Sequence, residues 1–385
     1  MTTRNRLIAQ SLGQVISNNN LSEDGQVLST AATTVYGSEY TAATDLSGIS
    51  DSSGFVDGSL HYLSKIRKLY VWDDSDGSFY NITLDGDALS ATVAGEFYQG
   101  SSFGYQAGGA NNTFVGNVIQ KYSFTTDQNA TDVGDLATSI VTNAQHSSTT
   151  HGYSAGGQTP AKSNVIQKYS FSVDGNATDV GDLTQTREFT TGSSSEASGY
   201  SMGGNAPPTV TTIDKYPFSS DTNASDVGDL SIANQQGTGV QSTTNGYNAG
   251  GTGDKTRIDK FPFSTDTNAS DIADLITGTS RPAGQSSSTH GYVSGGSDPG
   301  NVQLNVIQKF TLTVDANSTD VGDLTAVKYG ASGTSSTASG YLAGGFHPTY
   351  FNVIEKFPFS TDTNTTDVGD LVESVQPGSG TGAQV

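Results

Sequence analysis

Six short turns in this sequence alternate carboxylate and amide oxygens, as a loop that holds a metal ion would. The first turn carries Asp127, Asn129 and Asp132, and equivalent residues recur in five more turns. Hard cations such as Ca²⁺ prefer oxygen ligands of this kind. However, the bidentate Glu and the turn Gly of a calcium loop are absent, and Asp and Asn also bond to their own backbone in Asx turns. We therefore interpret the turns as structural and assign no metal, with Asp127, Asn129 and Asp132 as the alternative calcium ligands.

Residue types that perform catalysis show no convergent pattern. Cysteine is absent, so neither a thiolate nucleophile nor a disulfide can form. Of the five histidines, His151 and His290 occupy equivalent turn positions, which favours a shared structural role over metal binding. No acid differs from its counterparts as a general acid or base would. We predict no catalytic residue, no cofactor and no enzymatic activity.

A third group of residues has the chemistry of an interface. Aromatic and arginine side chains anchor many binding surfaces. The candidates for ligand or partner binding are Phe114, Arg187, Phe189, Arg257, Arg281, Tyr329, Phe346, His347, Tyr350 and Phe351. All of them lie in segments that differ from one repeat to the next. The alternative is neutral drift in unconstrained loops.

The elements that position these residues form a repeat. Gly-Tyr-x-x-Gly-Gly recurs six times, and each copy is followed by a Lys-aromatic strand and by Asp-(Val/Ile)-(Gly/Ala)-Asp-Leu. Successive Gly-Tyr pairs are 48, 47, 47, 45 and 49 residues apart; they begin at Gly104, Gly152, Gly199, Gly246, Gly291 and Gly340. Repeats of this length made of short strands and turns predict an all-β fold, a six-bladed β-propeller of four-stranded blades over residues 91–371.

Within each unit the strands predict two kinds of loop. The small residues of strands 1 and 2 fit near the crowded axis, and the strand 3 aromatics can pack on the next blade. If strand 1 runs up, the loops between strands 2 and 3 and between strands 4 and 1 emerge on one face. These are the loops that vary, and recognition residues favour such loops on a rigid scaffold.

One lysine and one aspartate recur at a fixed offset in every unit. The lysines are Lys121, Lys168, Lys215, Lys260, Lys309 and Lys356. The aspartates that precede the strand 4 leucine are Asp135, Asp182, Asp229, Asp274, Asp323 and Asp370. We predict that they form a repeated ion pair, inside a blade or between blades, with six equivalent binding sites as the alternative.

The ends of the chain are less regular. Residues 1–32 are predicted to form an anchor in which Leu7, Ile8, Leu12 and Ile16 dock on a partner, and residues 33–90 a small β domain. Its best hairpin joins Lys68–Trp72 to Ser78–Thr83. Residues 372–385 form a tail or closing strand. The ring could be closed by this tail or by a strand near Leu84–Leu89, and the sequence does not choose between them.

Composition limits the partners. The chain has 385 residues and a net charge of −21, and a field of that sign repels phosphate backbones and anionic lipid. No segment approaches the ~18 apolar residues of a membrane span, and the N-terminus has no apolar run of signal-peptide length. We expect neither nucleic-acid binding nor membrane insertion nor export.

The repeats resemble those of the kelch family of propellers, with a double glycine after strand 2 and a Thr-Asn turn after strand 3. Strand 4 departs from that family because it carries Val-Gly-Asp-Leu without tryptophan. The sequence motifs at 266–271 and 286–292 are more similar to the kelch-like repeats of marine and cyanobacterial phage structural proteins than to those of the kelch family itself. Residues 58–82 are similar to a small β module of such virion proteins, which acts there as a joint or decoration.

This resemblance implies a virion protein made in the host cytoplasm, a tail- or capsid-associated fibre. Its N-terminal region would bind other virion proteins, and its propeller would bind a host receptor or glycan. Fibre proteins of this sort are commonly trimers, so a homo-oligomer is expected. The alternatives are a passive decoration protein and a carbohydrate-active propeller enzyme.

Overall fold

The computed structural model describes residues 37–39, 60–63, 68–73, 78–85, 88–93, 100–253, 255–378 and 381–385. The chain divides into two compact units, Met1–Glu96 and Phe97–Val385, which we describe separately. The predicted anchor residues Leu7, Ile8, Leu12 and Ile16 lie outside the described residues.

The N-terminal unit contains a five-stranded sheet in the order of the sequence. Its strands are β1 (Gly37–Glu39), β2 (Leu60–Leu63), β3 (Lys68–Asp73), β4 (Ser78–Asp85) and β5 (Ala88–Val93). The predicted hairpin is confirmed, since β3 and β4 pair antiparallel with Trp72 opposite Phe79. Leu84 and Leu89, which bound the segment considered as a closing strand, pair with each other across β4 and β5.

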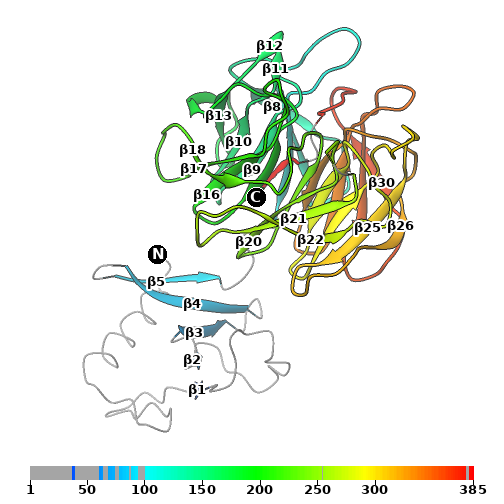
Figure 1. Cartoon of the computed structure of the whole chain (residues 1–385). Helices are drawn as coiled ribbons and strands as arrows, with labels where there is room; N and C mark the ends of the chain where they lie inside the picture. Colours follow the sequence, from blue (N-terminus) through cyan, green and yellow to red (C-terminus); the bar gives the residue numbers. More distant parts are fainter. Residues whose placement is uncertain are drawn as a thin grey trace, which may run out of the picture. The chain divides into compact units, whose positions relative to one another are not determined.

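The second unit is a six-bladed propeller of four-stranded antiparallel blades (Figure 1), as the repeat predicts. Blade 1 contains β6 (Phe103–Ala107), β7 (Val118–Ser123) and β8 (Thr131–Asp135), together with the C-terminal strand described below. Blade 2 contains β9 (Ala144–Ser147), β10 (His151–Ala155), β13 (Val165–Ser170) and β14 (Thr178–Asp182). Blade 3 contains β15 (Thr191–Ser194), β16 (Ser198–Met202), β17 (Thr212–Pro217) and β18 (Ser225–Asp229). Blades 4 to 6 contain β19 (Thr238–Gln241), β20 (Asn245–Ala249), β21 (Arg257–Pro262), β22 (Ser270–Asp274); β23 (Ala283–Ser286), β24 (His290–Ser294), β25 (Val306–Thr311), β26 (Thr319–Asp323); and β27 (Ser332–Ser335), β28 (Ser339–Ala343), β29 (Val353–Pro358), β30 (Thr366–Asp370). A two-stranded hairpin, β11 (Gln158–Thr159) and β12 (Ala161–Lys162), extends one loop of blade 2.

The C-terminal tail closes the ring. Strand β31 (Ala383–Gln384) pairs with β6 as the innermost strand of blade 1, with Ala383 opposite Tyr105. Beside it, Thr381 forms a parallel bridge with Gly333 of blade 6. Of the two closures that the sequence left open, the structure therefore contains the one made by the tail.

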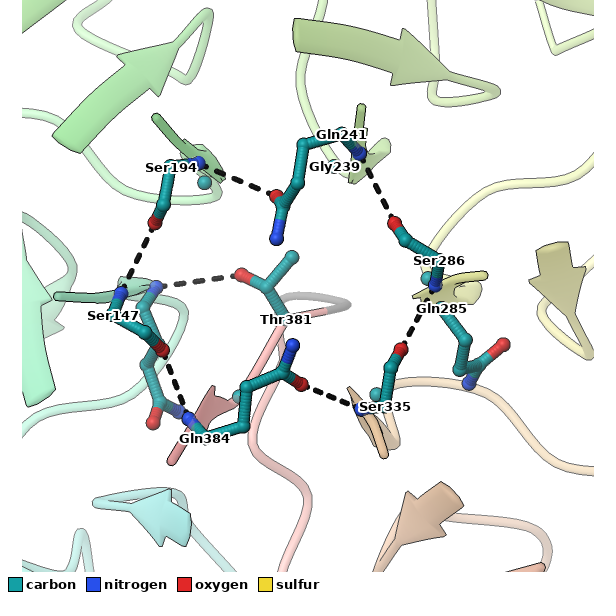
Figure 2. Close-up of a pocket in the computed structure, with 14 residues that line it drawn as sticks. Ser147, Ser194, Gly239, Gln241, Gln285, Ser286, Ser335, Thr381 and Gln384 are labelled. Carbon is teal, nitrogen blue, oxygen red and sulfur yellow. Dashed lines mark hydrogen bonds between the residues drawn. The ribbon is translucent and has the colours of Figure 1, made fainter. Parts of the chain in front are cut away.

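A ring of hydrogen bonds surrounds the axis, where the innermost strands meet (Figure 2). In each blade, the backbone N–H of the last residue of the innermost strand donates to a side-chain oxygen of the next blade, over 2.5–3.3 Å. The participants are Ser147, Ser194, Gln241, Ser286, Ser335 and Gln384. The Ser-rich composition of the inner strands thus satisfies backbone donors that the crowded axis would otherwise leave unpaired.

Aromatic side chains join each blade to its neighbour, as predicted for strand 3. The ring of Tyr105 in blade 1 lies 5.8 Å from Tyr169 in blade 2, and Tyr341 in blade 6 lies 6.2 Å from Tyr122 in blade 1. Each hydrophobic cluster contains residues from two adjacent blades. The glycine of Gly-Tyr makes room for this packing, because a Cβ on Gly152 would lie 2.3 Å from the Tyr169 ring.

The repeated lysines do form ion pairs between blades, but the predicted acidic partner was wrong. Each lysine pairs with the aspartate of the next blade's Asp-x-Asn turn, as Lys121 does with Asp174 at 3.1 Å. The last pair, Lys356 with Asp127 at 2.6 Å, joins blade 6 to blade 1. The ring of pairs is completed by Lys168–Asp221, Lys215–Asp266, Lys260–Asp315 and Lys309–Asp362.

Candidate functional site

The two kinds of variable loop meet on one face of the propeller, which we call the loop face. A loop that leads from one blade into the next forms an antiparallel bridge with the strand 2–3 loop of the blade that it enters. Examples are Glu188 with Asn205 and Tyr329 with Phe346. The backbones of the two kinds of loop therefore support one another instead of projecting singly.

A ring of backbone hydrogen bonds lies in this face, around the axis. At one position of each entering loop, the N–H donates to the carbonyl of the equivalent loop before it, over 2.6–3.3 Å. The bonds run from Thr142 to Pro377, Phe189 to Thr142, Gln236 to Phe189, Arg281 to Gln236, Gly330 to Arg281 and Gly378 to Gly330. Five of these residues hold a φ of 56–67°, and four of the five carry a side chain there: Thr142, Phe189, Gln236 and Arg281. Left-handed backbone at residues other than glycine is uncommon and concentrates at functional sites.

Five side chains form a continuous strip that starts at this ring and crosses the loop face. The Arg281 guanidinium lies 5.2 Å from the Phe189 ring and 5.4 Å from the Tyr329 ring. Phe346 follows at 5.6 Å from Tyr329, and Tyr350 at 4.7 Å from Phe346. All five are partly exposed. We call Phe189, Arg281, Tyr329, Phe346 and Tyr350 the loop-face strip.

The strip contains five of the ten residues that the sequence predicts to bind a ligand or partner. Its outer end reaches blade 1, where the Tyr350 hydroxyl donates to Asn112 Oδ1 over 3.3 Å. Phe114, 36% exposed, lies in the same blade 1 loop but has no ring contact with the strip in the part of the chain that the structure describes. His347 follows Phe346 in sequence and is partly exposed. The ring of Phe351 lies under Lys328, whose Nζ is 4.6 Å from its centre.

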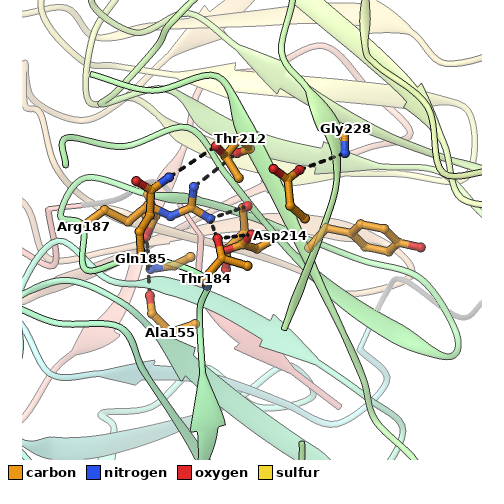
Figure 3. Close-up of polar contacts among 12 residues, drawn as sticks. Ala155, Thr184, Gln185, Arg187, Thr212, Asp214 and Gly228 are labelled. Carbon is orange, nitrogen blue, oxygen red and sulfur yellow. Dashed lines mark hydrogen bonds and ion pairs between the residues drawn. The ribbon is translucent and has the colours of Figure 1, made fainter. Parts of the chain in front are cut away.

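Arg187 is not a surface residue, which corrects its prediction as a binding residue (Figure 3). Its side chain is fully buried and pairs with the equally buried Asp214 of β17 at 2.9 Å. The guanidinium also donates to the carbonyls of Ser201 and Thr212, over 3.0 and 3.2 Å. Burial lowers the pKa of Arg187, and the charge of Asp214 opposes that shift. Arg187 therefore stabilises the junction of blades 2 and 3.

Arg257 is occupied as well. Its Nη1 contacts Asp271 Oδ2 at 2.5 Å and donates to Ser231 Oγ over 3.3 Å. Asp271 belongs to β22 of blade 4 and Ser231 to the loop that leads from blade 3 into blade 4, so Arg257 stabilises its own blade and the loop that enters it, and lies outside the loop-face strip.

The candidate calcium ligands have other roles in the structure. Asp127 pairs with Lys356, and Asn129 Oδ1 accepts the N–H of Asp370 from the preceding blade over 3.1 Å. Asp132 accepts the N–H of Gly134 over 3.1 Å. The turn thus connects blades through the same oxygens that a cation would need. No cluster of three or more His, Cys, Asp or Glu residues with metal-site geometry occurs within the described residues.

The buried groups His146, Lys328 and Glu355 do not belong to the loop-face strip, although Lys328 directly precedes Tyr329 in the sequence. His146 is fully buried, its Nδ1 accepts from the Tyr216 hydroxyl, and its Nε2 donates to the Tyr200 carbonyl, both over 2.9 Å. Burial lowers the pKa of His146 to about 4. Lys328 and Glu355 form a second buried pair at 3.2 Å, and burial raises the pKa of Glu355. These groups are engaged in packing.

The axial channel is too narrow for an organic ligand. It is lined by polar residues of the inner strands and by Thr381, and it encloses about 20 Å³ (Figure 2). That is room for one or two water molecules. The loop face is therefore the better candidate for a binding surface.

Sequence reasoning missed the residues that hold the strip in place. Gln236 separates Phe189 from Arg281 in the backbone ring, and Asn112 supports Tyr350. An alignment of the repeats would have identified Gln236, because Thr142, Phe189, Gln236, Arg281 and Gly330 follow the repeat spacing. Asn112 has no such signal.

Comparison with known proteins does not assign the chain. No protein-family model matches the sequence, and no curated protein matches it. Within the described residues there is also no helix long and apolar enough to cross a membrane. The function must therefore be argued from the loop face itself.

Proposed function

We propose that this chain is a structural protein of a phage particle, associated with the tail or capsid, whose propeller binds a host surface receptor or glycan. The observation that carries the proposal is the loop-face strip. Aromatic and arginine side chains are the residue types that dominate interface energetics, and here each contacts the next on one face of the propeller.

The physical case for recognition is that the strip is fixed before a ligand arrives. Bridged loops and the backbone ring restrain it, so less conformational entropy is lost on binding. A strip of partly exposed side chains suits an extended chain or a surface better than a small molecule enclosed in a cleft.

The assignment to a phage particle is supported by the resemblance of the repeats to kelch-like repeats of marine and cyanobacterial phage structural proteins. A net charge of −21 also suits a protein displayed in many copies, because like-charged surfaces repel and remain soluble. Mass spectrometry of purified particles tests this part. The polypeptide should be present in them, and its absence would end the proposal.

Adsorption of particles to host cells tests the recognition part. The test variant is Phe346→Ser with Tyr350→Ser, which shortens the strip. The control is Val173→Ser with Val314→Ser, which changes two valines that are 69% and 65% exposed in turns on the opposite face. We expect the test variant to lose adsorption and the control to keep it.

The same assay separates the alternatives. A passive decoration protein would tolerate both double substitutions with no change in adsorption. A carbohydrate-active enzyme would release shortened fragments when incubated with host surface glycans, whereas a binding protein should release none.

A further inference from the structure

Among the residues that the structure describes, Arg281 has no acidic partner, unlike the other two arginines of the propeller. Arg187 pairs with Asp214 and Arg257 with Asp271. For the Arg281 guanidinium, the described part of the chain contains neither an ion pair nor a hydrogen bond, and its Nε is covered without a partner. The donors that remain for a ligand are Nη1 and Nη2.

Two aromatic rings hold this guanidinium, as the distances to Phe189 and Tyr329 show. Stacking on aromatic rings favours a weakly hydrated guanidinium and leaves its edge free to donate. A group that is partly dehydrated and held still forms stronger hydrogen bonds with a ligand than a free side chain would. The arrangement therefore prepares the donors of Arg281 for an acceptor.

The backbone of Arg281 is fixed on both sides. Its N–H donates to the Gln236 carbonyl over 2.6 Å, and its own carbonyl accepts from Gly330 over 2.8 Å. These bonds belong to the ring around the axis, so Arg281 projects from hydrogen-bonded backbone on both sides.

Two acids in the described loops of this face have partners of their own. Glu188 pairs with Lys162 at 3.1 Å, and Asp298 Oδ1 accepts the N–H of Val302 over 2.8 Å. The chain has 38 acidic residues and only 17 basic ones, so an arginine without a carboxylate is unexpected by composition alone. A ligand could supply the missing anion.

We propose that Arg281 binds the anionic group of an acidic sugar, a carboxylate or a sulfate ester. The planar guanidinium matches two oxygens of either group. Phe346 and Tyr350 continue the strip and offer aromatic surface to the apolar face of the sugar. This inference rests on the proposed function, since it names the chemistry of the receptor that the loop face takes.

The test measures dissociation constants of the full chain by ligand-observed NMR with three probes: methyl glucuronide, methyl glucoside and methyl glucoside 6-sulfate. The main variant is Arg281→Gln, because Gln236 occupies the equivalent position of the neighbouring loop with the same left-handed backbone. Arg281→Lys keeps the charge without the planar fork. Arg257→Gln removes the same charge elsewhere and leaves the loop-face strip intact. Thermal unfolding of each variant is recorded alongside.

The wild type and Arg257→Gln should bind at least one anionic probe roughly tenfold or more tighter than methyl glucoside. Arg281→Gln should lose that preference, and Arg281→Lys should retain part of it. The tighter anionic probe then identifies the group as carboxylate or sulfate.

Equal binding of all three probes by the wild type would overturn the inference, as would no binding or a preference that Arg281→Gln keeps. A lower unfolding midpoint in Arg281→Gln, with equally weakened binding of all probes, would make Arg281 a packing residue. In each case the proposed function still stands if adsorption requires Phe346 and Tyr350, and it fails separately if adsorption does not.

Discussion

Replacing Arg187 by Ile tests the distinction between the buried arginine and the surface arginine. The substitution leaves the Asp214 carboxylate buried without its cation, because both side chains are fully buried in the wild type. Breaking such a pair from one side costs about 3–5 kcal/mol. The carbonyls of Ser201 and Thr212 lose donors as well.

The chain contains its own template for repairing this variant. In blade 2 the equivalent positions hold Ile140 and Gln167, both buried. The double variant Arg187→Ile with Asp214→Gln therefore reproduces a neutral arrangement that the fold already accepts. We expect it to recover most of the loss and to lie within about 2 kcal/mol of the wild type.

The assay is urea unfolding of the wild type, both single variants and the double variant, which together form a double-mutant cycle. Additive effects, with the double variant less stable than either single variant, would refute the reasoning. A stable Arg187→Ile variant with impaired adsorption would refute it too, because Arg187 would then be a contact residue as the sequence first indicated.

Three further predictions concern the blades. The pKa of His146 is about 4 in the folded state against 6.5 in the unfolded state, so the unfolded state binds the proton first and the free energy of unfolding falls as the pH drops from 6.5 towards 4. Between pH 7 and pH 5 the wild type should lose roughly 2 kcal/mol more stability than His146→Gln. Equal changes in the urea midpoints of the two proteins over this pH range would contradict the prediction. Gly239→Ala places a Cβ 1.7 Å from the Gly192 carbonyl oxygen and should lower the free energy of unfolding by about 3 kcal/mol or more. Gly175→Ala is the control and should be nearly neutral, because a Cβ there meets nothing within 4 Å. Equal unfolding midpoints of the two variants would argue against contact between the inner strands. Deleting residues 381–385 removes β31 from blade 1 and should lower the thermal midpoint by ~10 °C or more, and an unchanged midpoint would mean that the tail does not close the ring.

The blade count and the blade-to-blade aromatic packing were predictable because both are properties of the repeat. Every blade must bury an aromatic residue against the adjacent blade, so the position of Tyr169 is aromatic in all six repeats and indicates the fold. The loop-face residues were predictable by the opposite signal, since Phe189, Arg281 and Tyr350 stand where the copies differ.

The ion-pair partner could not be predicted for a reason built into repeats. Asp135 and Asp174 belong to two aspartate series with the same period, so periodicity cannot say which series meets Lys121. The choice depends on how adjacent blades are placed, and Asp174 is 53 residues away in the next blade.

Two other features leave a weaker signal in the sequence. Asp214 occupies a position that is Gln in three blades, Gln120, Gln167 and Gln308, and acidic in two others, Asp259 and Glu355. Glu355 pairs with the buried Lys328 as Asp214 does with Arg187, so only a comparison of these two blades would have placed Arg187 inside. The closing strand is only Ala383–Gln384, too short for alternation to mark it.

The measurement that tests the central claim most directly is cryo-electron microscopy of the intact particle. We predict that the loop-face strip, from Phe189 to Tyr350, points away from the particle and is open to solvent. A reconstruction in which this strip is buried against another virion protein would contradict the account.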